Sequence, residues 1–130
     1  MAKYVYPAVF TREKEGNYSV IFKDLEGCYT CGDTLEEALY MAEDVLAFTL
    51  YHYEKNNKEI PESNDSVTVK ANEFVNYIRC DTEEYHKRNN NKAVKKTVSI
   101  PEWLNEKAVA AGVNFSQVLQ EGLKEKLNIA

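Results

Sequence analysis

The chain has 130 residues, of which 44% are hydrophobic and 12% aromatic, and its formal net charge is −5. These values exclude a disordered chain, and no apolar run is long enough for a transmembrane helix. The N-terminal residues lack the apolar core of a signal peptide, and three cysteines cannot all pair within one chain. We therefore expect a cytoplasmic protein that makes no membrane contact and keeps its cysteines reduced.

The first third of the chain predicts a small antiparallel sheet. Residues 4–10 and 18–23 alternate along their length and are joined by a polar turn, which is typical of a β-hairpin. Pro7 favours an edge strand or a bulge, because it cannot donate a ladder hydrogen bond. We expect a short third strand at residues 28–31.

The strongest helix signal begins at Thr34. Thr34 and Glu37 have the spacing of a capping box, in which each side chain accepts a hydrogen bond from the other residue's backbone. Apolar residues then recur at spacings of three and four as far as Tyr53, which predicts one broad buried face and an end near residues 56–57. Strands and helix together predict an α+β fold with a small antiparallel sheet and one long helix.

The middle of the chain is more polar. We expect a loop at residues 58–65 and short strands at 67–69 and 74–80. Residues 82–91 are strongly polar and predict a linker between modules, in which a helical turn can form. The chain is thus expected to hold two modules, which we place at residues 1–81 and 92–130.

The two parts of the chain differ in charge. Residues 1–91 carry 10 Lys and Arg against 17 Asp and Glu, a net charge of −7, whereas residues 92–130 carry a net charge of +2. An acidic body and a basic tail indicate two partners of opposite charge.

The tail, residues 92–130, predicts one strand followed by two helices. Residues 95–100 alternate between a polar and an apolar face, Pro101 suits the first turn of a helix, and Gly112 suits its end. Residues 114–117 then form a second capping pattern. This module is too small to bury a core, and a lone strand leaves its backbone groups unpaired, so we expect it to pair with a second copy.

Such pairing would build a two-stranded ribbon with Lys95, Thr97 and Ser99 on its outer face. A ribbon of this width fits the major groove of DNA, where these side chains reach bases and phosphates. We expect Lys96 to contact the DNA backbone. Asn114 and Ser116 begin the last helix, whose free backbone amides can bind a phosphate. A helical hairpin that dimerises without DNA is the alternative.

Two stretches of sequence resemble known families. Residues 97–101 (TVSIP) and 112–119 (GVNFSQVL) resemble ribbon-helix-helix DNA-binding domains. Residues 18–28 (YSVIFKDLEGC), residues 32–38 (GDTLEEA) and Ile60-Pro61 resemble the HicB family of antitoxins, with Glu26 where that family has proline.

The HicB resemblance implies a fold and two partners. It implies a partial RNase H-like front domain that binds and blocks a HicA-type toxin, a small basic mRNA interferase. It also implies a tail that forms a homodimer, with further pairing to a tetramer left open, and that represses its own operon by binding operator DNA. On this basis the candidate toxin contacts are the acidic residues Asp24, Glu26, Asp33 and Glu36. The mechanism is binding, without catalysis, metal or cofactor.

Three other readings use the same residues. Cys28 and Cys31 have the spacing of half a zinc site, but the further ligands would be Cys80 and His86, whose own spacing is unusual. The acidic residues could instead form the metal cluster of a small nuclease. The tail could also serve a stand-alone repressor that has a ligand-sensing front domain.

Overall fold

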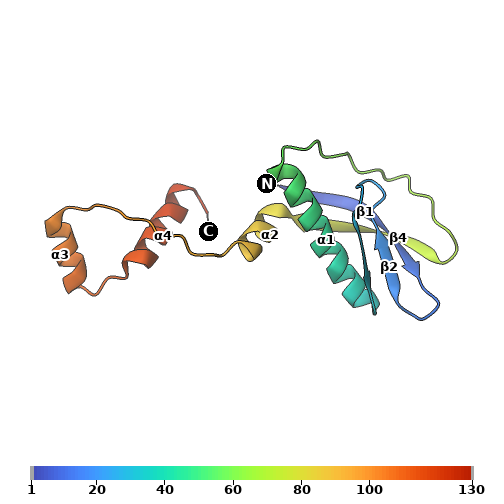
Figure 1. The fold of residues 1–130 in the computed structure, drawn as a ribbon, viewed down its shortest axis with the longest axis horizontal. Helices are drawn as coiled ribbons and strands as arrows, with labels where there is room; N and C mark the ends of the chain where they lie inside the picture. The colour runs from blue at the N-terminus through green and yellow to red at the C-terminus, as the bar shows by residue number, and fades with distance from the viewer. Residues whose placement is uncertain (1, 130) are drawn as a thin grey trace. The chain divides into compact units, whose positions relative to one another are not determined.

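The computed structural model describes residues 2–129 and divides into two compact units, Met1–Lys92 and Ala93–Ala130. The front unit holds a four-stranded sheet and two helices, and the tail unit holds two helices (Figure 1). No helix within residues 2–129 has the length and apolar character needed to cross a membrane.

The sheet is antiparallel throughout, with the strand order β3-β2-β1-β4. Its strands are β1 (Lys3–Arg12), β2 (Tyr18–Ile21), β3 (Tyr29–Gly32) and β4 (Glu73–Asp81). The predicted hairpin of the first two strands is confirmed. β1 is a central strand, yet β2 pairs only with residues 9–12 of it, so Pro7 is flanked by β4 alone. At Pro7, β1 therefore has a neighbouring strand on one side only, as proline requires because it cannot donate a ladder hydrogen bond.

Helix α1 (Leu35–Lys55) covers one face of the sheet (Figure 1). Thr34 caps it, because the Thr34 hydroxyl accepts a hydrogen bond from the Glu37 amide at 3.1 Å. Ala38 and Ala42 are fully buried, and their small side chains let the helix approach the strands closely. The core beneath α1 is formed by Tyr6, Ala8, Phe10, Val20, Phe22, Leu25, Leu46, Leu50, Ile78 and Cys80.

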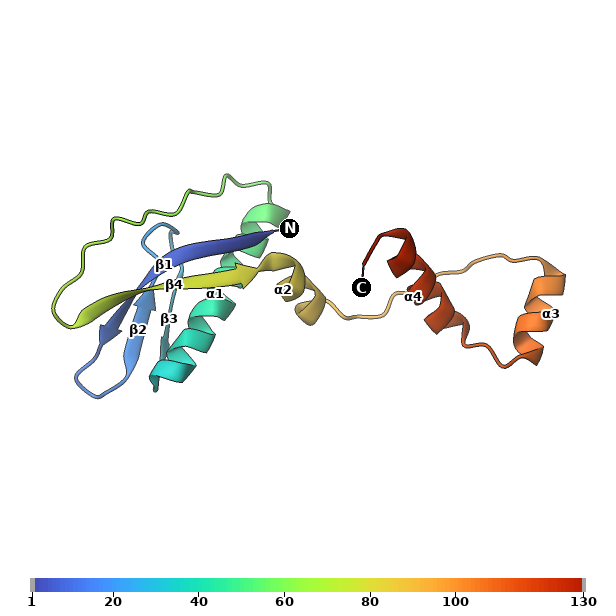
Figure 2. The same cartoon turned by 180° about the vertical axis from the view of Figure 1, so that it is seen from behind.

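A long loop leads from α1 along the sheet to the far end of β4 (Figure 2). The strand predicted at residues 67–69 does not form, so that prediction is wrong. The neighbour of β1 on that side is instead β4, which pairs with it from Lys3↔Asp81 to Thr11↔Glu73. The predicted strand at 74–80 is confirmed as β4.

The polar stretch that the sequence assigns to a linker contains helix α2 (Thr82–Asn89), which packs on α1. The Asp81 carboxylate caps it by accepting hydrogen bonds from the amides of Glu83 and Glu84. Thr82 is fully buried and bonds with its hydroxyl to the backbone of Ala2. These contacts join residues 80 positions apart. The helix therefore depends on a partner that the polar sequence around residues 82–91 does not contain.

The tail unit contains α3 (Glu102–Ala110) and α4 (Phe115–Lys126). Gly112 ends α3 in the left-handed conformation, at φ +70°, with the Val113 amide donating to the Ala108 carbonyl at 3.1 Å. This is the Schellman arrangement expected for a C-terminal glycine. The Asn114 side chain caps α4 by accepting from the Gln117 amide at 3.1 Å. The predicted helix ends are therefore confirmed.

No residue within 93–129 is buried. Residues 90–101 of the single chain form no strand, so ribbon pairing between two copies stays a prediction. The exposed apolar side chains of this unit are Val94, Val98, Ile100, Trp103, Leu104, Val109, Val113, Phe115, Val118, Leu119, Leu123 and Leu127.

Candidate functional site

The four acidic residues predicted to contact a toxin lie at two ends of one hairpin. Asp24 and Glu26 occupy the turn between β2 and β3, whereas Asp33 and Glu36 follow β3 and begin α1. The register pairs Ile21 with Tyr29 near the turn and Tyr18 with Gly32 at the opposite end. The hairpin therefore separates the two pairs by about four residues, or roughly 13 Å of strand. The predicted set is not one cluster.

The two acidic residues of the turn differ in their surroundings. Asp24 is half-buried, and its carboxylate accepts a hydrogen bond from the Asn64 amide at 3.0 Å, which ties the turn to the loop after α1. Glu26 is exposed and precedes Gly27, which adopts φ +72°. Asp24 thus has a structural partner, and Glu26 is open to solvent.

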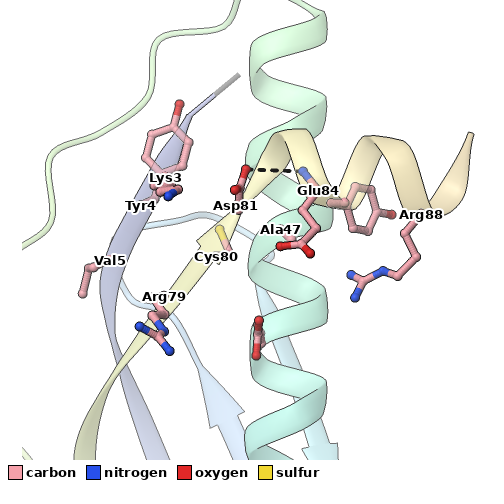
Figure 3. A pocket seen from close by; sticks show the side chains of 11 residues that line it. Lys3, Tyr4, Val5, Ala47, Arg79, Cys80, Asp81, Glu84 and Arg88 are labelled. Carbon is pink, nitrogen blue, oxygen red and sulfur yellow. Dashed lines mark hydrogen bonds between the residues drawn. The ribbon is translucent and has the colours of Figure 1, made fainter. Parts of the chain in front are cut away.

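A cavity of about 480 Å³ lies between α1, α2 and the paired ends of β1 and β4 (Figure 3). Lys3 and Arg79 line it from the strands, and Glu43 and Glu84 line it from the helices. Among residues 2–129, no ion pair joins these cations to these carboxylates, so opposite charges face the cavity unpaired.

The floor of the cavity includes Cys80, which is 5% exposed. Burial, reinforced by the neighbouring Glu43 carboxylate, raises the pKa of the Cys80 thiol to about 12. The thiol is therefore a neutral apolar group at physiological pH, not a nucleophile. Tyr4 lines the same cavity and donates a hydrogen bond to Glu54 at 2.7 Å.

Beside the cavity, α1 presents a row of residues of which only Glu36 was predicted from the sequence to be functional. We call it the outer α1 stripe, and its members are spaced four residues apart: Glu36, Tyr40, Asp44, Phe48 and His52. Phe48 is 48% exposed and Tyr40 67%. Arg88 of α2 forms an ion pair with Asp44 at 4.0 Å. The apolar periodicity of α1 predicts its buried face, whereas the stripe mixes aromatic and charged residues and therefore gives no such signal in the sequence.

The residues predicted to bind DNA all lie in the tail unit. Lys95, Lys96, Thr97 and Ser99 are exposed in the segment before α3. Asn114 and Ser116 lie at the start of α4, where Asn114 uses its side-chain oxygen as the helix cap. A phosphate at this position would meet the remaining backbone amides of the first turn.

The ligands of the alternative readings do not gather. Cys28 is buried and Cys31 is exposed, and His86 bonds to the Tyr51 hydroxyl at 2.9 Å. Across residues 2–129, no group of three His, Cys, Asp or Glu side chains is arranged to hold a metal ion. Neither a zinc site nor the metal cluster of a nuclease is formed by this part of the chain.

Known antitoxins match part of the chain in sequence. It is 43% identical over 56 residues to the protein Antitoxin HicB 1 of Photorhabdus laumondii, which is 43% of this chain and 36% of that protein. It is 38% identical over 56 residues to Antitoxin HicB of Escherichia coli K12, which is 43% of this chain and 41% of that protein. The match thus spans less than half the length of these relatives.

Solved structures match over most of the chain. A chain of a toxin–antitoxin complex from Streptococcus pneumoniae has a TM-score of 0.60 and 26% identity, and the match covers 95% of this chain and 99% of that one. The antitoxin HicB of Burkholderia pseudomallei has a TM-score of 0.53 and 15% identity, with 95% and 98% covered. The second likeness shows the fold alone.

A family model describes most of the sequence as well. The model for the HicB-like antitoxins of bacterial toxin–antitoxin systems matches residues 6–121, which include most of β1, the other three strands, α1, α2 and α3. The chain belongs to the HicB-like antitoxin family.

Proposed function

We propose that this chain neutralises a HicA-type mRNA interferase and represses its own operon by binding operator DNA. The observation that carries the first activity is the family match across residues 6–121. The likeness to a chain of a solved toxin–antitoxin complex supports it. The mechanism is binding in the cytoplasm, without a catalytic step.

In this proposal the front unit covers the RNA-binding surface of the toxin. A protein that cleaves RNA holds phosphates with cations, so an acidic partner competes for the same cations. The front of the chain, residues 1–91, carries a net charge of −7, which supports this role. The proposed contacts are Asp24, Glu26, Asp33 and Glu36.

The tail unit supplies dimerisation and DNA binding. The observation that supports this is that residues 93–129 contain two capped helices and no buried residue. A second copy would cover these apolar faces and would pair the two segments around Lys95–Ser99 into a ribbon. Lys95, Thr97 and Ser99 then face the major groove, with Lys96, Asn114 and Ser116 near phosphates.

The test separates the two activities in the full-length chain. Co-purification from native cells identifies the toxin, and a DNA fragment from upstream of the reading frame serves as operator. Replacing Lys95 and Thr97 together by alanine should weaken operator binding at least tenfold and leave inhibition of the toxin's RNA cleavage unchanged. Lys23→Ala removes the same charge from the front unit and is the control. Lost toxin inhibition in the double variant contradicts this division of roles.

A further inference from the structure

The outer α1 stripe combines exposed aromatic rings with carboxylates. Tyr40 and Phe48 alternate with Asp44 along it, and Glu36 begins it. Its four intervals of four residues extend over about 24 Å of helix. Exposed aromatic side chains in a polar frame are typical of protein contact sites, where a few such residues contribute most of the binding free energy.

Phe48 is held in place although it is half exposed. Its ring lies 4.4 Å from the His52 ring, centroid to centroid, and 6.4 Å edge-on from the ring of Tyr85 on α2. Tyr85 in turn lies 5.6 Å from Tyr51. A ring braced by neighbours on two helices loses little freedom on binding, so its contact area converts efficiently into affinity.

The negative charge of α1 favours a basic partner. The helix carries five carboxylates and one lysine, whereas the two glutamates of α2 are balanced by Lys87 and Arg88. Arg88 pairs with Asp44, whereas Glu43 forms no ion pair within the described residues and lines the cavity. A basic partner can therefore pair with α1 and place a cationic side chain near Glu43 and Glu84.

A second copy of this chain fits the stripe less well. In a symmetric dimer built on this face, the acidic helix would meet itself, and like charges would lie opposite one another. The open face of the sheet is the rival surface, since it exposes Ile21, Tyr29 and Tyr77. It shares Arg79 with the cavity wall and has no comparable excess of carboxylates, so it attracts a basic protein less strongly.

We propose that the outer α1 stripe, with Glu43 and the adjoining cavity, is the surface on which the basic toxin docks. This inference rests on the proposed function and narrows it, because it takes only Glu36 from the four acidic candidates. Asp24 and Glu26, in the turn at the other end of the hairpin, lie outside the stripe. Tyr40 and Phe48 provide the apolar contact, and Glu43 and Asp44 provide the charge.

The experiment measures the affinity of full-length variants for the toxin recovered by co-purification. Phe48→Ala and Tyr40→Ala should each weaken binding at least tenfold, and Glu43→Lys should slow association at least tenfold at low salt. Tyr77→Ala is the matched aromatic control, at 52% exposure, and Glu15→Lys is the matched charge control in an exposed turn. Both should stay within twofold of the wild type.

Each other outcome overturns the inference. Strong effects of Tyr77→Ala or Glu26→Lys, with normal binding by the stripe variants, would place the toxin on the open sheet face or on the turn. Loss of self-association in Phe48→Ala by light scattering, with unchanged toxin affinity, would assign the stripe to a second copy. Failure of the wild-type chain to bind the toxin would instead overturn the proposed function. Circular dichroism confirms that each variant is folded, and the two aromatic variants test the surface independently.

Discussion

Replacing Gly32 by alanine tests the close approach of β3 to α1. A Cβ atom at Gly32 would lie 2.4 Å from the backbone nitrogen of Ala38 and 2.7 Å from its Cα. Both contacts are with backbone, so no side chain can rotate away. The start of α1 must therefore move outward by about 1 Å to restore ordinary van der Waals distances.

Such a shift would loosen the best-packed part of the interface. Ala38 and Ala42 are 0% exposed, and the helix loses contact with the sheet at both when it moves. Overpacking of this kind costs about 1–3 kcal/mol, and we expect the upper part of that range because the clash is with a helix backbone. For a unit of this size, a loss of about 2–3 kcal/mol lowers the melting temperature by roughly 10–20 °C.

Urea unfolding followed by far-ultraviolet circular dichroism measures the effect. The midpoint for Gly32→Ala should fall while the slope stays unchanged, since the folded state remains compact. Gly122→Ala is the control, because it lies within α4 and, apart from its chain neighbours and the backbone of its own helix, no atom lies within 4 Å of the added carbon. There alanine should favour the helix by about 1 kcal/mol. A Gly32→Ala chain within about 0.5 kcal/mol of the wild type would refute the packing argument.

Three further measurements follow from single groups. In the native chain a thiol reagent should modify exposed Cys31 rapidly, and Cys80 only on unfolding, because burial shields its thiol and raises its pKa to about 12. Burial and the hydrogen bond to Glu54 raise the pKa of Tyr4 from 10.0 to about 12, so its contribution to stability is complete below pH 10 and is lost as the pH rises towards 12. The urea midpoint of Tyr4→Phe should therefore fall less over that range. Asn114→Ala removes the cap of α4 and should destabilise the tail helices by about 1 kcal/mol, measured as lower helicity and an earlier thermal transition.

The elements predicted from the sequence were those whose signals are local. Thr34 and Asn114 cap helices with their own side chains, and Gly112 supplies the left-handed residue that ends α3. Each effect involves neighbours within five positions, so the pattern can be recognised without the fold. The hairpin of β1 and β2 belongs to the same class.

The elements that were missed depend on distant parts of the chain. α2 forms where Thr82 is buried against Ala2, and no window of sequence around residues 82–91 contains that partner. Val67 and Val69 have strand-like spacing, but β4, not this segment, pairs with β1 over nine residues, and residues 67–69 form no strand. The predicted acidic residues are also separated by the pairing of β2 with β3, which places Asp24 and Asp33 at opposite ends of that hairpin.

The two units differ in whether they bury a core of their own, and this difference affects how the stability of each depends on protein concentration. The front unit buries its own core, with Phe10, Phe22 and Leu46 at 0% exposure. No residue within 93–129 of the tail unit is buried, and in the proposed dimer a second copy would cover the apolar faces of its helices. Its stability must then rise with protein concentration by mass action. Under the proposed function, toxin binding by the front unit would begin at a lower antitoxin concentration than operator binding by the tail. Repression would then respond to antitoxin present in excess of the toxin.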